Sequence, residues 1–288
     1  MFPKTILSVI ALTAGLSWHG DTFAACPSHE RINTILRFLE SREPIRGLRA
    51  DLSMQDAECG RRRLVEKLEA SDNRIIGYKA GLTNAQVQAR FGVSSPVRGV
   101  LLEQMMLKDG AEVPAAFGAR PVFEADLLVE VTGEVLPEVK TPAGVLRTLV
   151  RVMPFIELPD LGVAEGEKLS APLITFLNVG ARLGVVGKPV PVEATQAFAD
   201  ALMNMRVVVI DQDGKELARG SGAAILGHPL NAVIWLHEDL ARGRVQLKKG
   251  NVLSLGSFTP PLTPKAGTTV TVRYEGLPGN PAVSVRFR

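Results

Sequence analysis

Two acidic residues lie close together in an otherwise apolar segment of the chain. Glu124 and Asp126 stand in the sequence VFEADLLV, residues 122–129, where every second residue is apolar. Side chains of a β-strand point alternately to its two faces, so both carboxylates project from one face, about 7 Å apart. Because Val and Leu flank them on that face, we expect it to be half-buried. An ordinary solvated sheet face is the alternative interpretation, since an E-x-D pattern alone does not exclude it.

A third acidic residue ends another apolar segment. Glu157 follows VMPFI, residues 152–156, where a charge is out of character with the local composition. Three carboxylates in a half-buried site repel one another and lose hydration, so they need a compensating cation. Carboxylate oxygens are the ligands that hard divalent ions such as Mg²⁺, Mn²⁺ and Ca²⁺ prefer. We therefore interpret Glu124, Asp126 and Glu157 as candidate metal ligands.

Short strands separated by turns are the elements that must position these acids. Before them, residues 27–70 have the hydrophobic spacing of helices, and Ser53 with Asp56 indicates where the second helix begins. The DQDG sequence at 211–214 is typical of a hairpin turn. Residues 229–241 are predicted to be helical, because a proline opens a stripe of apolar residues there. The predicted strands are 74–79, 122–131, 151–157, 205–210, 215–219, 252–255, 268–274 and 282–287.

The composition fits a β-rich chain with a large core. Of 288 residues, 46% are hydrophobic, and 27 glycines and 19 prolines favour many turns over a helical bundle. We predict an α+β fold, β-rich, with one catalytic domain over residues 25–288 that includes a helical region at 25–73. The net charge of +3 and the lack of a basic block argue against nucleic acid as a partner. The RRR sequence at 61–63 is predicted to be a solvated helix face.

The first 24 residues resemble a secretory signal peptide. Lys4 gives a positive start, residues 6–16 form an apolar segment, and small residues precede a cleavage position before Ala25. The apolar segment is too short to span a bilayer, and no later segment is long and apolar enough to do so. We therefore expect a bacterial protein exported to the periplasm, with no membrane attachment after cleavage. An ordinary N-terminal helix is the alternative interpretation.

Both cysteines lie in the chain that remains after the predicted cleavage. An even number of cysteines in an oxidising compartment favours a disulfide, so we predict a bond between Cys26 and Cys59. This bond ties the new N-terminus to the first helical region and contributes about 3 kcal/mol through loop closure. Two unpaired thiols are the alternative interpretation.

Several motifs, in order along the chain, are similar to those of a known enzyme family. The sequence IGYKAGLT at 76–83 resembles the G-[YW]-K-x-G-L-T signature of 2-keto-4-pentenoate hydratases and 4-oxalocrotonate decarboxylases, in the fumarylacetoacetate hydrolase superfamily. The segments FEADL at 123–127 and PFIE at 154–157 resemble the V-E-A-E-[IL] and P-x-[IL]-E motifs of this family. Further similar segments are FGV with GVL within 91–101, GAAILGHPLNAVIWL at 222–236, and GNV with GS within 250–257.

The resemblance implies a fold and a set of site residues. It implies a mixed β-roll of the fumarylacetoacetate-hydrolase type with N-terminal and flanking helices, assembled as a homo-oligomer. It also implies that the three acids named above hold Mg²⁺ or Mn²⁺. The motif lysine of the family is Lys79 here, which we expect to stabilise substrate charge. Thr83 and Ser257 are expected to hydrogen-bond substrate or water. The alternative interpretations are a solvated lysine at position 79 and turn or strand hydroxyls without a role in binding at positions 83 and 257.

The same resemblance indicates a reaction class. A 2-oxo acid presents a carboxylate and an adjacent oxygen that can chelate one divalent ion, which then stabilises enolate charge. We therefore expect a metal-dependent hydratase, a lyase, acting on a small 2-oxo or 2-hydroxydienoic acid such as 2-hydroxypenta-2,4-dienoate. Decarboxylation of an oxo diacid, hydrolysis of an acylpyruvate, and binding of an oxo acid without turnover are the alternatives. The hydrolases use a His–Glu pair, and the candidate histidine here, His29, has no motif around it.

A few positions differ from the family pattern. Leu177 stands where the family usually has Asp, which predicts the loss of a polar group near the site. Asn251 stands where Asp is common, and Asp126 is one methylene shorter than the usual Glu. His228 precedes the proline that opens the helix at 229–241, so we expect it to cap or pack against that helix rather than to take part in catalysis.

Overall fold

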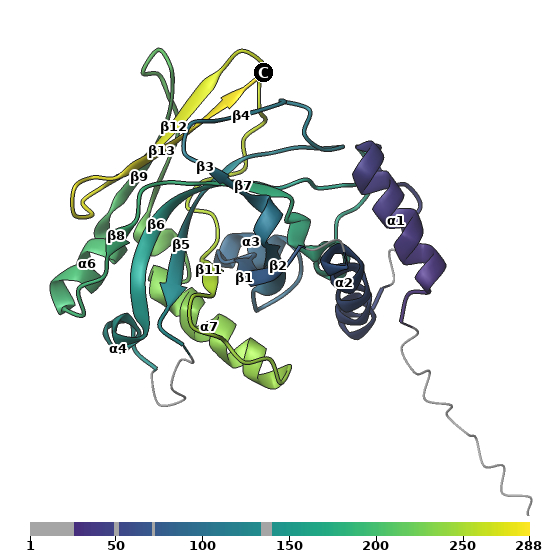
Figure 1. Cartoon of the computed structure of the whole chain (residues 1–288), viewed down its shortest axis with the longest axis horizontal. Helices are drawn as coiled ribbons and strands as arrows, with labels where there is room; N and C mark the ends of the chain where they lie inside the picture. The colour runs from purple at the N-terminus through teal and green to yellow at the C-terminus, as the bar shows by residue number, and fades with distance from the viewer. Residues whose placement is uncertain (1–25, 49–51, 71–72, 134–139) are drawn as a thin grey trace, which may run out of the picture.

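Two β-sheets with helices on their flanks make up the described part of the chain (Figure 1). The computed structural model describes residues 26–48, 52–70, 73–133 and 140–288. The predicted signal peptide, residues 1–24, and the alanine after its cleavage position lie outside the described residues. A search of the described residues finds no helix whose length and apolar character suit a membrane span.

The larger sheet carries the acidic motifs and mixes parallel and antiparallel strand pairs. Its strand order is β2-β1-β11-β5-β6-β7-β3, and the short β8 pairs with β6. Strand β1 runs parallel to β11, whereas β5 runs antiparallel to both β11 and β6. The strands are β1 (Ile75–Gly81), β2 (Val97–Leu102), β3 (Met106–Lys108), β5 (Glu124–Val131), β6 (Leu149–Leu158), β7 (Leu183–Val186), β8 (Val190–Pro191) and β11 (Val252–Ser254).

The smaller sheet has the strand order β10-β9-β12-β13-β4. Its strands are β4 (Ala111–Val113), β9 (Arg206–Asp211), β10 (Glu216–Ser221), β12 (Thr269–Glu275) and β13 (Ala282–Phe287). The predicted hairpin is confirmed: Asp211 Oδ1 accepts hydrogen bonds from the amides of Asp213 and Lys215, at 3.0 and 2.9 Å. Gly214 takes the positive φ of 79° that closes this turn.

Helices surround the sheets on several sides. The α-helices are α1 (His29–Ser41), α2 (Met54–Glu69), α3 (Ala85–Arg90), α4 (Pro142–Val145), α5 (Ala171–Phe176), α6 (Gln196–Asn204) and α7 (Pro229–Arg242). Short 3₁₀ turns are η1 (Glu103–Met105), η2 (Leu146–Thr148), η3 (Asn178–Gly180) and η4 (Gly222–Ala224). Helix α7 matches the predicted one, and its apolar stripe faces the core.

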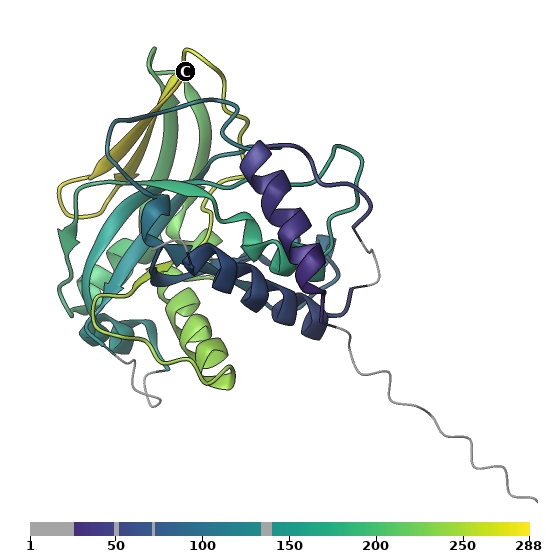
Figure 2. The same ribbon diagram turned by 45° about the vertical axis from the view of Figure 1, so that its right-hand side comes forward.

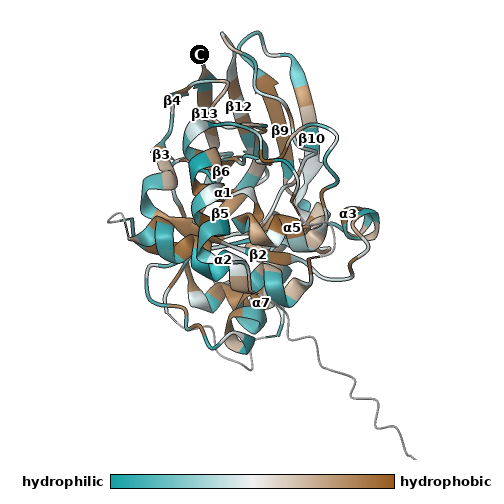
Figure 3. Cartoon of the chain, turned by 90° about the vertical axis from the view of Figure 1, so that its right-hand side faces the viewer, coloured by the Kyte–Doolittle hydropathy of each residue, from teal (hydrophilic) through white to brown (hydrophobic). Residues whose placement is uncertain are grey.

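The main core lies between the two sheets and helices α6 and α7. Ala125, Leu127 and Val129 of β5 are buried in it, together with Val272 of β12 and Leu236 of α7. The predicted apolar face of the 122–129 segment is therefore confirmed. Figure 3 shows the strands mostly in the hydrophobic colour, whereas the outer surface of α2 is largely hydrophilic.

Helices α1 and α2 lie side by side at one edge of the molecule (Figure 2). They share a second core with α5, to which Ile32, Ile35, Leu64 and Phe176 contribute. Gly60 permits this packing, since a Cβ there would lie 2.4 Å from the Phe176 ring. The N-terminal helices are therefore packed onto the β-rich body through α5 and through α2 itself, whose Val65 is buried in the main core.

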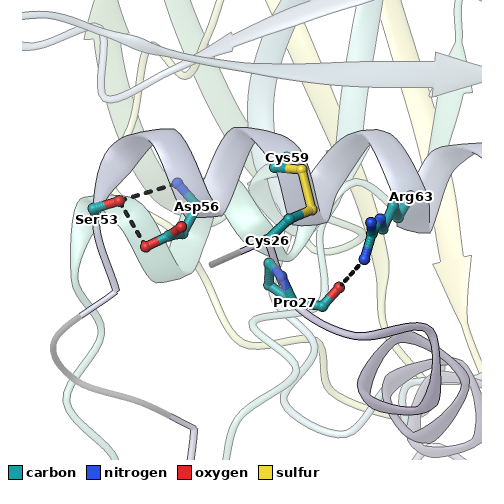
Figure 4. Close-up of a disulfide and its surroundings, with 6 residues drawn as sticks. All are labelled: Cys26, Pro27, Ser53, Asp56, Cys59 and Arg63. Atoms are coloured by element: carbon teal, nitrogen blue, oxygen red, sulfur yellow. Dashed lines mark hydrogen bonds between the residues drawn. A yellow bond between two sulfur atoms is a disulfide. The ribbon is translucent and has the colours of Figure 1, made fainter. Parts of the chain in front are cut away.

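A disulfide joins Cys26, ahead of α1, to Cys59 in the middle of α2 (Figure 4). Next to it, the Arg63 guanidinium donates a hydrogen bond to the carbonyl of residue 27 at 2.7 Å. At the start of α2, Ser53 Oγ accepts from the Asp56 amide at 3.1 Å, so the predicted cap is confirmed. The disulfide and the Arg63 hydrogen bond fix residues 26 and 27 to α2.

The prediction of a solvated face at 61–63 is wrong for its first residue. Arg61 is buried, and its guanidinium donates a hydrogen bond to the Arg98 carbonyl of β2. Burial, followed by the nearby Arg98 charge, lowers the pKa of Arg61 to about 10. Helix periodicity places position 61 on the inner side of α2, one turn before Leu64, and its long apolar stem suits that place.

Candidate active site

The three predicted acids lie on two neighbouring strands, β5 and β6. In the antiparallel register Glu124 is directly opposite Glu157, and Asp126 is opposite Phe155. Directly opposed residues point to the same face, with their Cβ atoms about 5 Å apart. Asp126 follows Glu124 by two positions and shares that face. The structure thus brings all three acids to one face of the larger sheet.

Apolar side chains flank the acids on this face. Leu101, Leu128, Met153 and Phe155 form a small buried cluster there. Asp126 is completely buried and Glu157 is 3% exposed. The alternative of an ordinary solvated sheet face is therefore wrong. Acidic groups in such surroundings interact strongly with one another and with any nearby cation.

Glu124 is the half-buried member of the trio. Burial, followed by repulsion from the Glu157 carboxylate, raises the pKa of Glu124 to about 7, and the Lys79 charge partly opposes this rise. Glu124 therefore keeps its proton up to neutral pH in the absence of a further positive charge. A bound cation is the kind of partner that favours its ionised form.

Asp126 is held by a ring of donors. Its Oδ1 accepts from the amides of Leu127, Leu255 and Gly256, at 2.5, 3.2 and 3.0 Å. Its Oδ2 accepts from the Ser254 hydroxyl at 2.5 Å. Burial outweighs these hydrogen bonds, so the pKa of Asp126 lies well above the ordinary value. The donors fix the carboxylate in place beside the turn that follows β11.

Lys79 reaches the acids from β1. It is 3% exposed, forms an ion pair with Glu157, and donates a hydrogen bond to the Val179 carbonyl at 3.0 Å. The alternative of a solvated lysine is therefore wrong. This buried ammonium supplies a positive charge beside Glu157, close to the other two acids.

A turn with unusual backbone angles presents the Val179 carbonyl to Lys79. Asn178 and Val179 both have a φ of 55°, which is uncommon for a non-glycine residue and strained for a β-branched one. The Asn178 side chain holds the turn by exchanging two hydrogen bonds with the Val100 backbone, at 2.8 and 2.9 Å. Gly99 leaves room for the lysine, since a Cβ there would lie 2.8 Å from Lys79 Cγ.

The donor set fits a hard divalent cation by its chemistry. Three carboxylates lie on one face, and the pKa values of two of them are raised. A positive charge nearby would lower both pKa values, because it favours the ionised carboxylate. The side chains as placed do not converge on one point, because Asp126 faces Ser254 and Glu157 faces Lys79. Accordingly, within the described residues no group of three or more His, Cys, Asp or Glu side chains is arranged as a metal cage.

Thr83 and Ser257, the two residues predicted to hydrogen-bond substrate or water, lie near the turn that binds Asp126. Their hydroxyl groups are placed differently. Thr83 is buried against Gly256, where a Cβ would lie 2.3 Å from its Oγ1. Gly256 has a φ of 103°, so glycine is required there for both reasons. Ser257 is half-buried, and its hydroxyl donates to the Thr259 carbonyl at 2.6 Å. The Ser257 hydroxyl is thus already used in a hydrogen bond within its own turn.

Some residues of the site were missed by the sequence analysis. Ser254 donates to Asp126, and the hydroxyl of Tyr274 contacts the backbone of the two acid-bearing strands. Thr259 Oγ1 is one of the buried side-chain atoms that have no hydrogen-bond partner within the described structure. The alternating pattern of residues 252–255 placed Ser254 on a strand, but no local signal marked Tyr274, which resembles any buried aromatic residue.

Leu177 and Asn251, two of the positions that differ from the family pattern, make their contacts away from the acids. The prediction that Leu177 removes a polar group near the site is wrong, because its side chain packs in the core of α1, α2 and α5. It also lines a cavity of about 410 Å³ beside those helices. Asn251 accepts from the Lys248 amide at 2.8 Å and donates to the Ile76 carbonyl at 3.1 Å. An aspartate cannot make the second bond.

Histidines do not contribute to this face in the described part of the chain. His228 caps α7, since its Nδ1 accepts from the Leu230 amide at 3.1 Å, which confirms the predicted role. Burial lowers the pKa of His228, so the neutral ring that can accept this bond is favoured. His29 is exposed at the first residue of α1. Among the described residues, the His–Glu pair of the hydrolases therefore has no counterpart at the acids.

The chain resembles characterised enzymes over most of its length. It is 30% identical over 209 residues to the 2-keto-4-pentenoate hydratase of Paraburkholderia phymatum, an alignment covering 72% of this chain and 77% of the relative. It is 30% identical over 258 residues to the 2-oxo-hept-4-ene-1,7-dioate hydratase of Escherichia coli, covering 86% and 93%. A comparison with family models gives no match.

A solved structure has the same architecture. The 4-oxalocrotonate decarboxylase from Pseudomonas putida G7, complexed with magnesium and adipate, matches with a TM-score of 0.80 and 25% sequence identity. The match covers 91% of this chain and 99% of that chain. The predicted fold, a mixed β-roll with N-terminal and flanking helices, is therefore confirmed.

Proposed function

Because the chain belongs to the 2-keto-4-pentenoate hydratase family of the fumarylacetoacetate hydrolase superfamily, we propose that it is a metal-dependent hydro-lyase for a small 2-hydroxydienoic acid. The observation that carries this proposal is the register of β5 and β6, which sets Glu124 opposite Glu157 with Asp126 on the same face. Lys79 adds a buried positive charge at these acids. A representative substrate is 2-hydroxypenta-2,4-dienoate.

Glu124, Asp126 and Glu157 are the residues that would hold the divalent cation. A bound cation supplies Lewis-acid stabilisation of the negative charge that develops on the oxygen at C2 of the substrate. We propose Mg²⁺ or Mn²⁺, because three carboxylates are hard oxygen ligands. The magnesium complex of the similar decarboxylase supports a divalent cation of this type.

Lys79 is the candidate for stabilising the negative charge of the substrate. Its ammonium group lies beside Glu157, in a buried setting where a charge acts strongly on its neighbours. We assign to Lys79 the stabilisation of the substrate carboxylate and of the enolate charge. The candidates for hydrogen bonds to substrate or water are Thr83 and Thr259, whose buried hydroxyl has no hydrogen-bond partner among the described residues. Ser257 is a weaker candidate for binding substrate, because its hydroxyl already donates a hydrogen bond to the Thr259 carbonyl.

The overall reaction is the addition of one water molecule. Protonation of 2-hydroxypenta-2,4-dienoate at C5 and loss of the enol proton give an α,β-unsaturated ketone. Water then adds its oxygen at C4 and a proton at C3, and the product is 4-hydroxy-2-oxopentanoate. The same stabilisation of enolate charge serves decarboxylation of an oxo diacid, and the structural match to the decarboxylase makes that reaction the second candidate.

A spectrophotometric assay tests the proposal. The purified protein with Mn²⁺ or Mg²⁺ should remove the ultraviolet absorbance of 2-hydroxypenta-2,4-dienoate, and a chelator or Glu124→Gln should abolish this activity. Glu130→Gln is the matched control, because Glu130 lies on the same strand but is paired with Arg151. Release of carbon dioxide from 4-oxalocrotonate without hydration identifies a decarboxylase instead. Tight binding of oxalate with no turnover of either substrate contradicts the enzyme proposal.

We also propose export to a bacterial periplasm and assembly as a homo-oligomer. The disulfide between Cys26 and Cys59 supports an oxidising compartment. The protein should be found in the periplasmic fraction with Ala25 as its first residue, and a protein that stays in the cytoplasmic fraction with an intact N-terminus contradicts export. Sedimentation should give a mass that is a multiple of the processed chain, and a monomer at micromolar concentration contradicts the assembly.

A further inference from the structure

The chain contains two tyrosines, and one of them reaches the backbone beneath the acids. Tyr274 is on β12 of the smaller sheet and is completely buried. Its ring packs edge-on against Phe258, with the ring centroids 6.3 Å apart. Its hydroxyl donates to the Asp126 carbonyl, lies 3.0 Å from the Phe155 carbonyl, and accepts from the Phe155 amide at 3.2 Å. A single hydroxyl thus contacts both acid-bearing strands.

The position of this hydroxyl in the ladder follows from the neighbouring hydrogen bonds. The carbonyls of Ala125 and Leu127 accept from the amides of Phe258 and Leu255, so they point away from β6. Carbonyls alternate direction along a strand, so the Asp126 carbonyl points toward β6. Asp126 is opposite Phe155 in the register, and the Phe155 amide and the Asp126 carbonyl are therefore facing ladder groups. Tyr274 accepts from one and donates to the other.

Packing alone does not account for the hydroxyl. The ring fills the core as a phenylalanine would, and a buried hydroxyl costs free energy unless its hydrogen bonds are made. What the hydroxyl adds is a fixed separation between β5 and β6 at one point. That point lies at Asp126 itself, one residue pair along the face from the opposed Glu124 and Glu157.

We propose that Tyr274 is a positioning residue for the cation site. Its hydroxyl sets the spacing of β5 and β6 at the Asp126–Phe155 pair, and that spacing sets how closely the three carboxylates can approach one ion. The smaller sheet thereby contributes to a site whose ligands all lie on the larger one. This inference rests on the proposed function, because it presupposes that the acids bind a divalent cation.

Titration calorimetry with Mn²⁺ alone on the full processed protein tests this role. Tyr274→Phe removes only the hydroxyl, and we expect the Kd for Mn²⁺ to rise by about 10- to 100-fold, as when an outer-shell partner is lost. Tyr78→Phe is the matched control, because Tyr78 is the other buried tyrosine and points to the opposite face of β1 from Lys79. Its Kd should equal that of the unmodified protein.

A second control separates positioning from stability. Val272→Ala removes buried apolar volume from the same strand, two residues from Tyr274, and should lower the thermal midpoint without changing the Kd. Equal Kd values for Tyr274→Phe and the unmodified protein overturn the positioning role, and so does a Kd raised equally in Val272→Ala. Failure of the unmodified protein to bind Mn²⁺ contradicts instead the proposed function, so the two failures are distinguishable.

Discussion

Glu124 and Glu157 occupy directly opposed positions of the antiparallel β5–β6 pair, so their side chains project next to each other from one face of the sheet. Like charges in directly opposed positions destabilise a sheet. The arrangement is therefore a cost to the fold that a ligand can relieve. Stability and function are expected to oppose each other at these residues.

Replacing Glu124 by glutamine should stabilise the metal-free protein and disable the metal site. The substitution removes the repulsion from Glu157, so the free energy of unfolding at pH 8 should rise. The affinity for Mn²⁺ should fall by more than the 10- to 100-fold that an outer-shell change typically causes. Urea unfolding with a chelator and calorimetry with Mn²⁺ measure the two effects. Glu130→Gln, used as control, should change neither, and a destabilised Glu124→Gln contradicts the prediction.

The stability of the metal-free protein should fall as pH rises from about 5 to 7. The pKa of Glu124 is raised from 4.5 to about 7 in the folded state, so between these values the folded chain holds a proton that the unfolded chain has released. This contribution to stability is fully present below pH 4.5 and is lost as pH passes through about 7. The raised pKa of Asp126 acts in the same direction.

Urea unfolding at several pH values, in the presence of a chelator, checks this pH dependence. The difference in stability between the unmodified protein and Glu124→Gln isolates the titration of that one group. The difference should change across the window from pH 5 to 7 and level off on either side. A difference that stays constant with pH shows that the folded state does not perturb Glu124.

Removing the charge of Lys79 should destabilise the protein and stop turnover. Lys79→Met leaves the buried Glu157 without its partner, and breaking such a pair costs about 3–5 kcal/mol. The double variant with Glu157→Gln should recover part of that loss, because no unpaired charge then remains. Saturating Mn²⁺ should also restore stability to Lys79→Met, since the cation takes over the compensation. Thermal melts with and without Mn²⁺ show whether it does.

The face shared by Glu124 and Asp126 was predictable because it depends on local alternation alone. Phe123, Ala125 and Leu127 turn inward, and the acids must then turn the other way. The approach of Glu157 depends on which strands pair and in what register, and no local pattern specifies that. Glu157 could still be identified as a candidate, because its charge is unexpected in an apolar segment and its motif resembles that of the family.

The groups that hold the acids in place could not be predicted from the sequence, for a different reason. Val179 meets Lys79 through a backbone carbonyl, which carries no side-chain signal, and its positive φ contradicts the preference of a β-branched residue. Tyr274 acts from another sheet. Leu177 was expected near the acids because the family usually has Asp at this position. Its side chain instead packs among the N-terminal helices, whereas the side chain of the next residue, Asn178, bonds to the backbone of β2.

Loss of the disulfide should lower stability without affecting the metal site. The bond closes a loop with a sequence separation of 33 residues, for which the loop-closure model gives about 3–4 kcal/mol. The variant with both Cys26→Ala and Cys59→Ala should unfold at lower urea concentration and bind Mn²⁺ unchanged, because α2 packs on α5 rather than on the acids. Reductant should lower the stability of the unmodified protein by the same amount as the double substitution does. Two titratable thiols before reduction would contradict the bond.

Substitution of Leu177 should act on folding and leave catalysis intact. The side chain is 7% exposed within the core of the N-terminal helices, so Leu177→Ala should cost about 2–5 kcal/mol. Leu177→Asp restores the residue usual in the family, but here it buries a carboxylate among leucines and isoleucines and should destabilise the protein further. Turnover by the folded fraction of Leu177→Ala should stay within about twofold of the unmodified value, since the acids and Lys79 are untouched. A fall of kcat in the fully folded variant, with unchanged affinity for Mn²⁺, would show that position 177 acts on the reaction after all.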